Sequence, residues 1–168
     1  MRHLIALLLQ NEAGALTRVT GLISSRGYNI ESLSVAPTTD PTVSRVTLVT
    51  IGSDAVISQI NAQLLKLVDV VSVEDMTSGD HLARELLLIK LHLKAAEVEA
   101  VGALLRRAGG KVLSSNPSSF IMELASTEVE IGEFIANVSA FGEIVEVVRS
   151  GALGISRSNP RLHAVKRG

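Results

Sequence analysis

The chain has 168 residues, enough for one ordinary domain or two small ones, and its 46% hydrophobic residues are typical of a globular protein. A formal net charge of −1 argues against a general affinity for nucleic acids or anionic membranes. The absence of cysteine excludes disulfides, thiol nucleophiles and cysteine-based metal sites.

The N-terminal apolar run is too short for a signal peptide, and Gln10, Asn11 and Glu12 interrupt it without a cleavage site. No segment reaches the roughly 18 apolar residues needed to span a bilayer. The expected location is therefore the cytoplasm, without a membrane partner.

The first half reads in order as an apolar strand over 3–9, a polar turn, and a helix over 14–26 that ends at Gly27, a predicted left-handed residue. A strand over 29–36 follows, and its slipped alternation at Glu31 and Ser32 predicts a bulge or a late start. After a turn over 37–42 come a β-branched strand over 43–51, a helix capped near 52–54, and a strand over 68–74.

The same order then returns. We expect a strand over 84–93, a helix over 95–108, strands over 111–115 and 120–125, a helix capped by Thr127, and a strand over 143–149. The predicted fold class is α+β, with two tandem ferredoxin-like βαββαβ units. The expected division is a first domain over 1–76, a linker over 77–81, a second domain over 82–157 and a basic tail over 158–168.

The turn between the first strand and helix carries Asn11 and Gly14. Unpaired N–H groups at a helix start favour a carboxylate or phosphate, and an amide can both donate and accept, so this corner suits an amino-acid zwitterion. The alternative is that both are ordinary turn residues. The second half has Leu93-Lys94-Ala95-Ala96-Glu97 at this place, without Asn or Gly, which favours a ligand site confined to the first half but leaves both interpretations open.

Three stretches carry a resemblance to a known family: Asn11-Glu12-Ala13-Gly14-Ala15-Leu16-Thr17-Arg18-Val19, Arg26-Gly27-Tyr28-Asn29-Ile30-Glu31-Ser32-Leu33-Ser34-Val35-Ala36-Pro37 and Asp40-Pro41-Thr42-Val43-Ser44-Arg45. They resemble the N-terminal ACT domain of the regulatory (small) subunit of acetohydroxyacid synthase, also called acetolactate synthase. The second half, with Arg84-Glu85-Leu86 and the ending 149–157, resembles that family's C-terminal domain.

The resemblance implies a non-catalytic subunit that activates the thiamine-diphosphate-dependent catalytic subunit and confers feedback inhibition by valine or another branched-chain amino acid. Thiamine diphosphate, Mg and FAD are then expected in the partner and no cofactor in this chain. The implied effector-binding residues, carried over where the letters match, are Asn11, Gly14, Ala15 and Asn29, with Leu16 and Ile30 lining the effector's alkyl side chain.

Topology adds an expectation about where such an effector sits. In a split βαβ unit, strands 1 and 2 run parallel, so Asn11 and Asn29 lie at opposite ends of the sheet, separated by a helix of about 20 Å. One chain cannot bring both to one amino acid. Because strand 2 is an edge strand, we expect a homodimer through the ACT domains, with two effectors between them.

The alternative functions are catalysis, RNA binding and amino-acid sensing without a partner. The four histidines, His3, His81, His92 and His163, show no metal-ligand spacing, and no nucleophile elbow or phosphate loop supports an enzyme. RNA-recognition motifs share the βαββαβ order, but the strands over 3–9 and 43–51 lack the aromatic residues that stack bases. A stand-alone amino-acid sensor without a catalytic partner remains the closest alternative.

Overall fold

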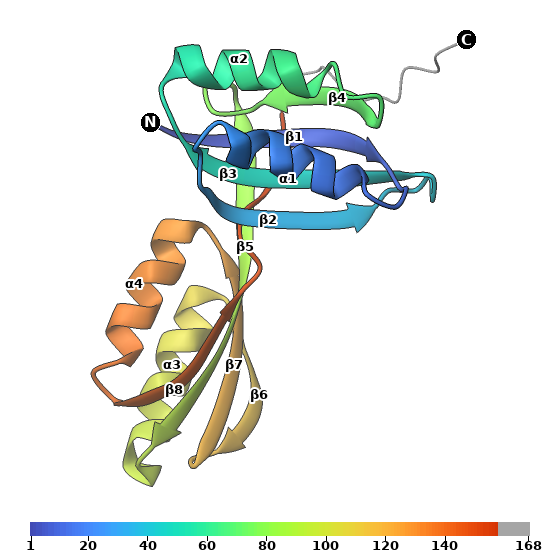
Figure 1. Cartoon of the computed structure of the whole chain (residues 1–168). Helices are drawn as coiled ribbons and strands as arrows, with labels where there is room; N and C mark the ends of the chain where they lie inside the picture. The colour runs from blue at the N-terminus through green and yellow to red at the C-terminus, as the bar shows by residue number, and fades with distance from the viewer. Residues whose placement is uncertain (158–168) are drawn as a thin grey trace. The chain divides into compact units, whose positions relative to one another are not determined.

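The computed structural model describes residues 1–157 and contains two compact units. Among the described residues, unit 1 comprises Met1–Ala83 together with residues 152–157, and unit 2 comprises Arg84–Gly151. In each unit two helices cover one face of an antiparallel sheet, with the element order βαββαβ (Figure 1). The predicted α+β fold class, with two repeated units, is confirmed.

Unit 1 contains a sheet with the strand order β2-β3-β1-β4, so β2 is an edge strand, as predicted. Its elements are β1 (Arg2–Gln10), α1 (Ala15–Ser25), β2 (Ile30–Pro37), β3 (Val43–Ile51), α2 (Asp54–Leu64) and β4 (Val70–Asp75). Both β1 and β2 pair antiparallel with β3 and therefore run parallel to each other.

The central strand β1 is buried on both faces, and every residue over 3–9 is buried. One face carries Ile5 and Leu7 and packs against the helices, whereas the other carries Leu4 and Ala6. This explains the nearly continuous apolar run, because a strand covered on one face only would alternate with polar residues.

A short strand that the sequence analysis did not predict helps to cover the second face. This strand, β9 (Leu153–Ser156), pairs with β5 (His81–Leu93). The neighbouring Ala152 and the buried Met76 pack against β1 in the same cluster. Residues 152–157 therefore pack with unit 1, whereas the sequence analysis had placed them at the end of the second domain.

The close approach of β9 requires a glycine. A Cβ atom at Gly154 would lie 2.5 Å from the Cε of Met76 and 2.9 Å from the Cδ2 of Leu4. The carbonyl oxygen of Gly154 also accepts a hydrogen bond of 2.9 Å from the Nη2 of Arg45, on β3. A side chain at position 154 would therefore require Met76 and Leu4, or the segment itself, to shift within this packed cluster.

Unit 2 repeats the arrangement with the strand order β6-β7-β5-β8. Besides β5 it contains a 3₁₀ turn (Ala95–Glu97), α3 (Val98–Ala108), β6 (Lys111–Asn116), β7 (Ser119–Ser126), α4 (Glu128–Val138) and β8 (Gly142–Arg149). Thr127 caps α4 as predicted, in a full capping box with Glu130.

Local predictions were accurate except at some element ends. The register of β2 shifts between Ile30 and Ser32, which confirms the bulge, and Gly27 has the predicted left-handed conformation (φ 76°). The strand expected over 68–74 begins only at Val70, because residues 65–69 continue as turns after α2. The strand expected from residue 84 begins earlier, at His81, within the expected linker.

Candidate functional site

Asn11 follows β1 directly and is held by the loop before β3. Its backbone N–H donates to the carbonyl of Thr42 at 2.8 Å, and its side-chain Nδ2 donates to the carbonyl of Pro41 at 3.0 Å. The Oδ1 of Asn11 has no hydrogen-bond partner among residues 1–157. The loop therefore orients the amide and leaves its oxygen as an acceptor for a ligand.

Gly14 lies just before α1 and has a left-handed backbone (φ 84°), without a side-chain cap on the helix. The N–H of Ala15, one of the expected effector-binding residues, donates to the carbonyl of Glu12 at 3.2 Å and is not an open donor. Within the described chain, the N–H groups of Gly14, Leu16 and Thr17 have no backbone acceptor. These three are the donors that the helix start offers to an anion.

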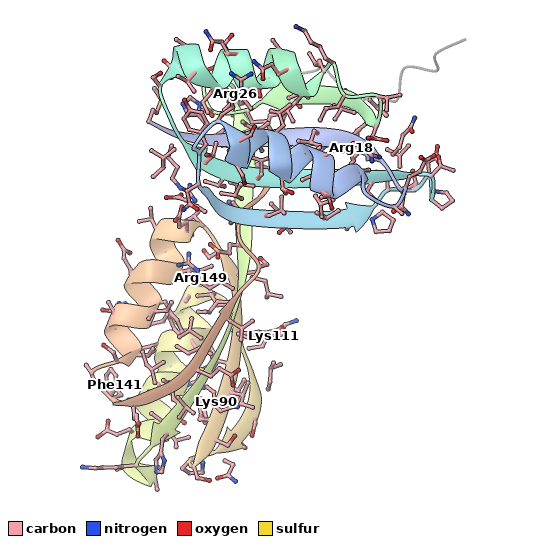
Figure 2. All side chains as sticks on the ribbon, viewed as in Figure 1. Arg18, Arg26, Lys90, Lys111, Phe141 and Arg149 are labelled. Carbon is pink, nitrogen blue, oxygen red and sulfur yellow. The ribbon has the colours of Figure 1, made fainter. Side chains whose placement is uncertain are left out.

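Arg18 adds a fixed positive charge beside this helix start (Figure 2). Its Nε donates to the Oδ2 of Asp69 at 2.5 Å, and a Cβ at position 14 would lie 3.0 Å from its Nη1. The side chain of Asp69 is buried. The backbone carbonyl of Asp69 accepts a hydrogen bond of 2.8 Å from the backbone N–H of Gln10. The hydrogen bond from Arg18 lowers the pKa of Asp69 and raises the pKa of the guanidinium, so both stay charged.

Sequence reasoning missed Arg18, although its spacing was a usable signal. Residues four apart share one face of a helix, and helical side chains lean toward the N-terminus, so a cation four residues after Gly14 covers the turn. Its partner Asp69 lies 51 residues further along the chain, and no sequence pattern pointed to it.

A hollow of about 470 Å³ lies next to Asn11. Asp40 and Glu12 bring two carboxyl groups to its lining, and Val43 and Val71 bring aliphatic side chains. Asp40 accepts hydrogen bonds from the hydroxyl and backbone N–H of Thr42, which lower the pKa of its carboxyl. This side of the turn therefore suits an ammonium group, while the helix start with Arg18 suits a carboxylate.

The remaining predicted residues lie elsewhere. Leu16 and Ile30 are half-buried and pack against the core of unit 1. Asn29 is exposed at the far end of the sheet, where its carbonyl accepts a hydrogen bond from Thr50. On β3, the residue next to Asn11 (Gln10) pairs with Val43, and the residue next to Asn29 (Ile30) pairs with Thr50. These two β3 residues are seven positions apart, which corresponds to about 24 Å along a strand. One chain thus places Asn11 and Gly14 at one end of the sheet and Asn29 and Ile30 at the other, as the topology predicted.

Over residues 1–157, no group of three or more His, Asp or Glu side chains is placed to hold a metal ion. Over the same residues, no helix has the length and apolar character needed to cross a membrane.

Comparisons with known proteins cover both halves. Residues 5–72 match the family model described as the AHAS small subunit-like ACT domain, and residues 84–158 match the model for the small subunit of acetolactate synthase. The isozyme 3 small subunit of acetolactate synthase from Escherichia coli is 44% identical over 159 residues, which is 95% of this chain and 98% of that protein. The acetolactate synthase small subunit of Haemophilus influenzae is 38% identical over 162 residues, covering 96% and 99% of the two chains.

The fold also matches a solved structure. The crystal structure of the acetolactate synthase small subunit from Thermotoga maritima superposes with a TM-score of 0.85 at 28% sequence identity. The match covers 95% of this chain and 99% of that one, so the order of both units is shared.

Proposed function

Because this chain belongs to the family of acetolactate synthase small subunits, we propose that it activates the thiamine-diphosphate-dependent catalytic subunit and makes that subunit sensitive to feedback inhibition by valine. The chain is the non-catalytic, regulatory member of the enzyme, and its partner is the catalytic large subunit. In this proposal thiamine diphosphate, Mg and FAD belong to the partner.

The observation that supports an amino-acid effector most strongly is the contrast between the two repeats. Leu93 of unit 2 donates to the carbonyl of Pro117 at 2.8 Å, the counterpart of the bond between Asn11 and Thr42. The strand end is therefore held by the following loop in both units, although unit 2 continues in a 3₁₀ turn (Ala95–Glu97) where unit 1 has the left-handed Gly14. The two helices that follow can be aligned on the left-handed glycines at their ends, Gly27 and Gly109. Nine residues before these glycines, unit 1 has Arg18 whereas unit 2 has Ala100. Unit 2 has Leu93 and Ala100 in place of Asn11 and Arg18, so the fold itself does not require these two polar side chains.

The edge position of β2 supports a homodimer. Two β2 strands that pair antiparallel across a two-fold axis would set the start of one strand beside the end of the other. The end of β2 leads into the loop that holds Asn11, and the start follows Asn29. Each of two effectors would then contact the Asn11 turn of one chain and Asn29 with Ile30 of the other.

A reconstitution assay tests the proposal. The chain alone should form no acetolactate from pyruvate, and added to the purified catalytic subunit it should raise the rate and introduce inhibition by valine. An unchanged rate and no valine response, with the two proteins shown to associate, would contradict it. A chain that binds valine but never associates with the catalytic subunit would instead support the stand-alone sensor.

A further inference from the structure

A second hollow, of about 330 Å³, lies in unit 2 between the two helices on the sheet. Its apolar wall is formed by Leu104 of α3, Leu124 of β7 and Phe134 of α4. Leu124 and Phe134 are only 1% and 5% exposed, so they belong to the core of the unit. The volume is within the range of small-molecule sites, which begins at about 300 Å³.

Charged and polar groups of opposite character surround this wall. Arg107 comes from the last turn of α3, and Glu133 and Asn137 come from α4, one helical turn apart. In the part of the chain that the structure describes, neither Arg107 nor Glu133 makes a hydrogen bond or ion pair with its side chain. The hollow thus offers a free cation and a free carboxylate beside aliphatic surface.

A second carboxyl group at the rim, that of Glu130, is already engaged. It accepts hydrogen bonds from the hydroxyl of Ser126 and from the N–H and hydroxyl of Thr127, in the capping box of α4. These bonds lower the pKa of Glu130 to about 2. Glu130 therefore serves the helix end, and Glu133 is the carboxylate left for a ligand.

Unit 1 has different residues at two positions that line this hollow in unit 2. The left-handed glycines Gly27 and Gly109 end α1 and α3, and the residues before them are Arg26 and Ala108. Gln63 is the tenth residue after Ser53, the N-cap of α2, and Asn137 is the tenth residue after Thr127, the N-cap of α4. Gln63 and Asn137 are therefore equivalent positions in the two units, as are Arg26 and Ala108.

In unit 1 the residues at these two positions, Arg26 and Gln63, form a hydrogen bond between the helices. The Nη2 of Arg26 donates to the Oε1 of Gln63 at 2.9 Å, at the end of α1 opposite Arg18 (Figure 2). In unit 2 the equivalent pair is Ala108 and Asn137, and both line the hollow. A methyl group stands where the bridging guanidinium would be, so the space stays open.

We propose that the hollow of unit 2 binds a free α-amino acid with an aliphatic side chain. Arg107 holds the carboxylate, Glu133 and the Oδ1 of Asn137 hold the ammonium group, and the alkyl chain lies against Leu104 and Phe134. This site shares no residue with the Asn11 turn, and its occupation does not depend on the function proposed above.

Titration of the full chain with L-leucine, followed by NMR of leucine and valine methyl groups, tests this proposal. Saturable shifts are expected for Leu104 and Leu124 at millimolar ligand, about the affinity of a small ligand with few contacts. The methyl groups of Val43 and Val71, which line the Asn11 hollow, report separately on the first site. The two sites can therefore fail or succeed independently.

Variants that introduce the unit 1 residues into unit 2 should fill the hollow. Ala108→Arg, alone and with Asn137→Gln, should bridge α3 to α4 and abolish the shifts of Leu104 and Leu124. Arg107→Gln and Glu133→Gln should each raise the dissociation constant at least about tenfold. Arg106→Gln is the matched control, because Arg106 is adjacent but pairs with Glu99 at 2.7 Å and should leave binding unchanged.

Two results would overturn the proposal. One is the absence of saturable shifts at Leu104 and Leu124 in the unmodified chain. The other is unchanged binding in Arg107→Gln and Glu133→Gln, both of which replace exposed side chains and should fold even if Ala108→Arg does not.

Discussion

Arg18 and Asp69 form an ion pair of 2.5 Å that connects the start of α1 to the residue preceding β4. The carboxylate is only 4% exposed and the guanidinium 46%, so Asp69 acts as a buried anchor that holds an accessible cation beside Gly14. The positive charge stays at the helix start whether or not a ligand is present, and binding then needs little reorganisation of this side chain.

The first prediction concerns this cation. Arg18→Gln should raise the valine concentration for half-inhibition about tenfold, because it removes a charged donor near the proposed carboxylate position. It should also lower the thermal stability, since Asp69 would stay buried without its partner. Arg26→Gln, at the other end of α1, is the control and should leave inhibition unchanged. Full valine sensitivity in Arg18→Gln would remove Arg18 from the site.

The second prediction concerns the turn itself. Asn11→Ala should weaken valine binding by about 1–3 kcal/mol, the usual cost of leaving a charged partner short of a hydrogen bond. Gly14→Asp should be worse, because it sets a negative charge among the open N–H groups.

Gly14→Asn is the matched control for that charge. Asn has a similar shape and tolerates the left-handed backbone better than other residues. Both Gly14 variants should still activate the catalytic subunit. Equal valine affinity in Gly14→Asp and Gly14→Asn, measured by calorimetry, would argue against a carboxylate at this position.

The third prediction tests the proposed dimer. Chains with Asn11→Ala and chains with Asn29→Ala should each bind valine weakly. A mixed dimer should recover one intact site, because both substitutions then fall in the other site. Heterodimers that form, as shown by mass spectrometry, yet bind no valine would refute a site shared between chains.

The fourth prediction is a pH dependence in unit 2. The pKa of Glu130 falls from 4.5 to about 2 in the folded chain, so its contribution to stability is complete above pH 4.5 and is lost as the pH falls toward 2. Glu130→Gln should therefore destabilise the unit at pH 7 and flatten its acid unfolding curve, followed by circular dichroism. Glu133→Gln, on the same helix, should keep the acid transition of the unmodified chain.

The fifth prediction concerns β9. Gly154→Ala should destabilise unit 1 by about 1–3 kcal/mol, as expected when a methyl group is forced into a packed contact. Gly132→Ala, in α4, is the control, because no atom lies within 4 Å of the added Cβ and alanine favours a helix. Urea unfolding of both variants would show the contrast, and equal stabilities would mean that β9 is not held against Met76 and Leu4.

The sequence by itself determined the features that depend on neighbouring residues. The apolar run over 3–9, the left-handed Gly27 and the cap at Thr127 are local signals, and each was predicted correctly. The repeated order of these signals was enough to give two βαββαβ units. It was also enough to place Asn11 and Asn29 at opposite ends of one sheet, since that follows from strand direction alone.

Only the tertiary structure decided the contacts between segments far apart in the chain. The pairing of Arg18 with Asp69, the packing of Gly154 on Met76 and the open space beside Ala108 each join different elements. None leaves a periodic trace in the sequence, because a four-residue strand or a single buried carboxylate is too short to show one. Their positions depend on the register and twist of the sheets, which the whole fold sets at once.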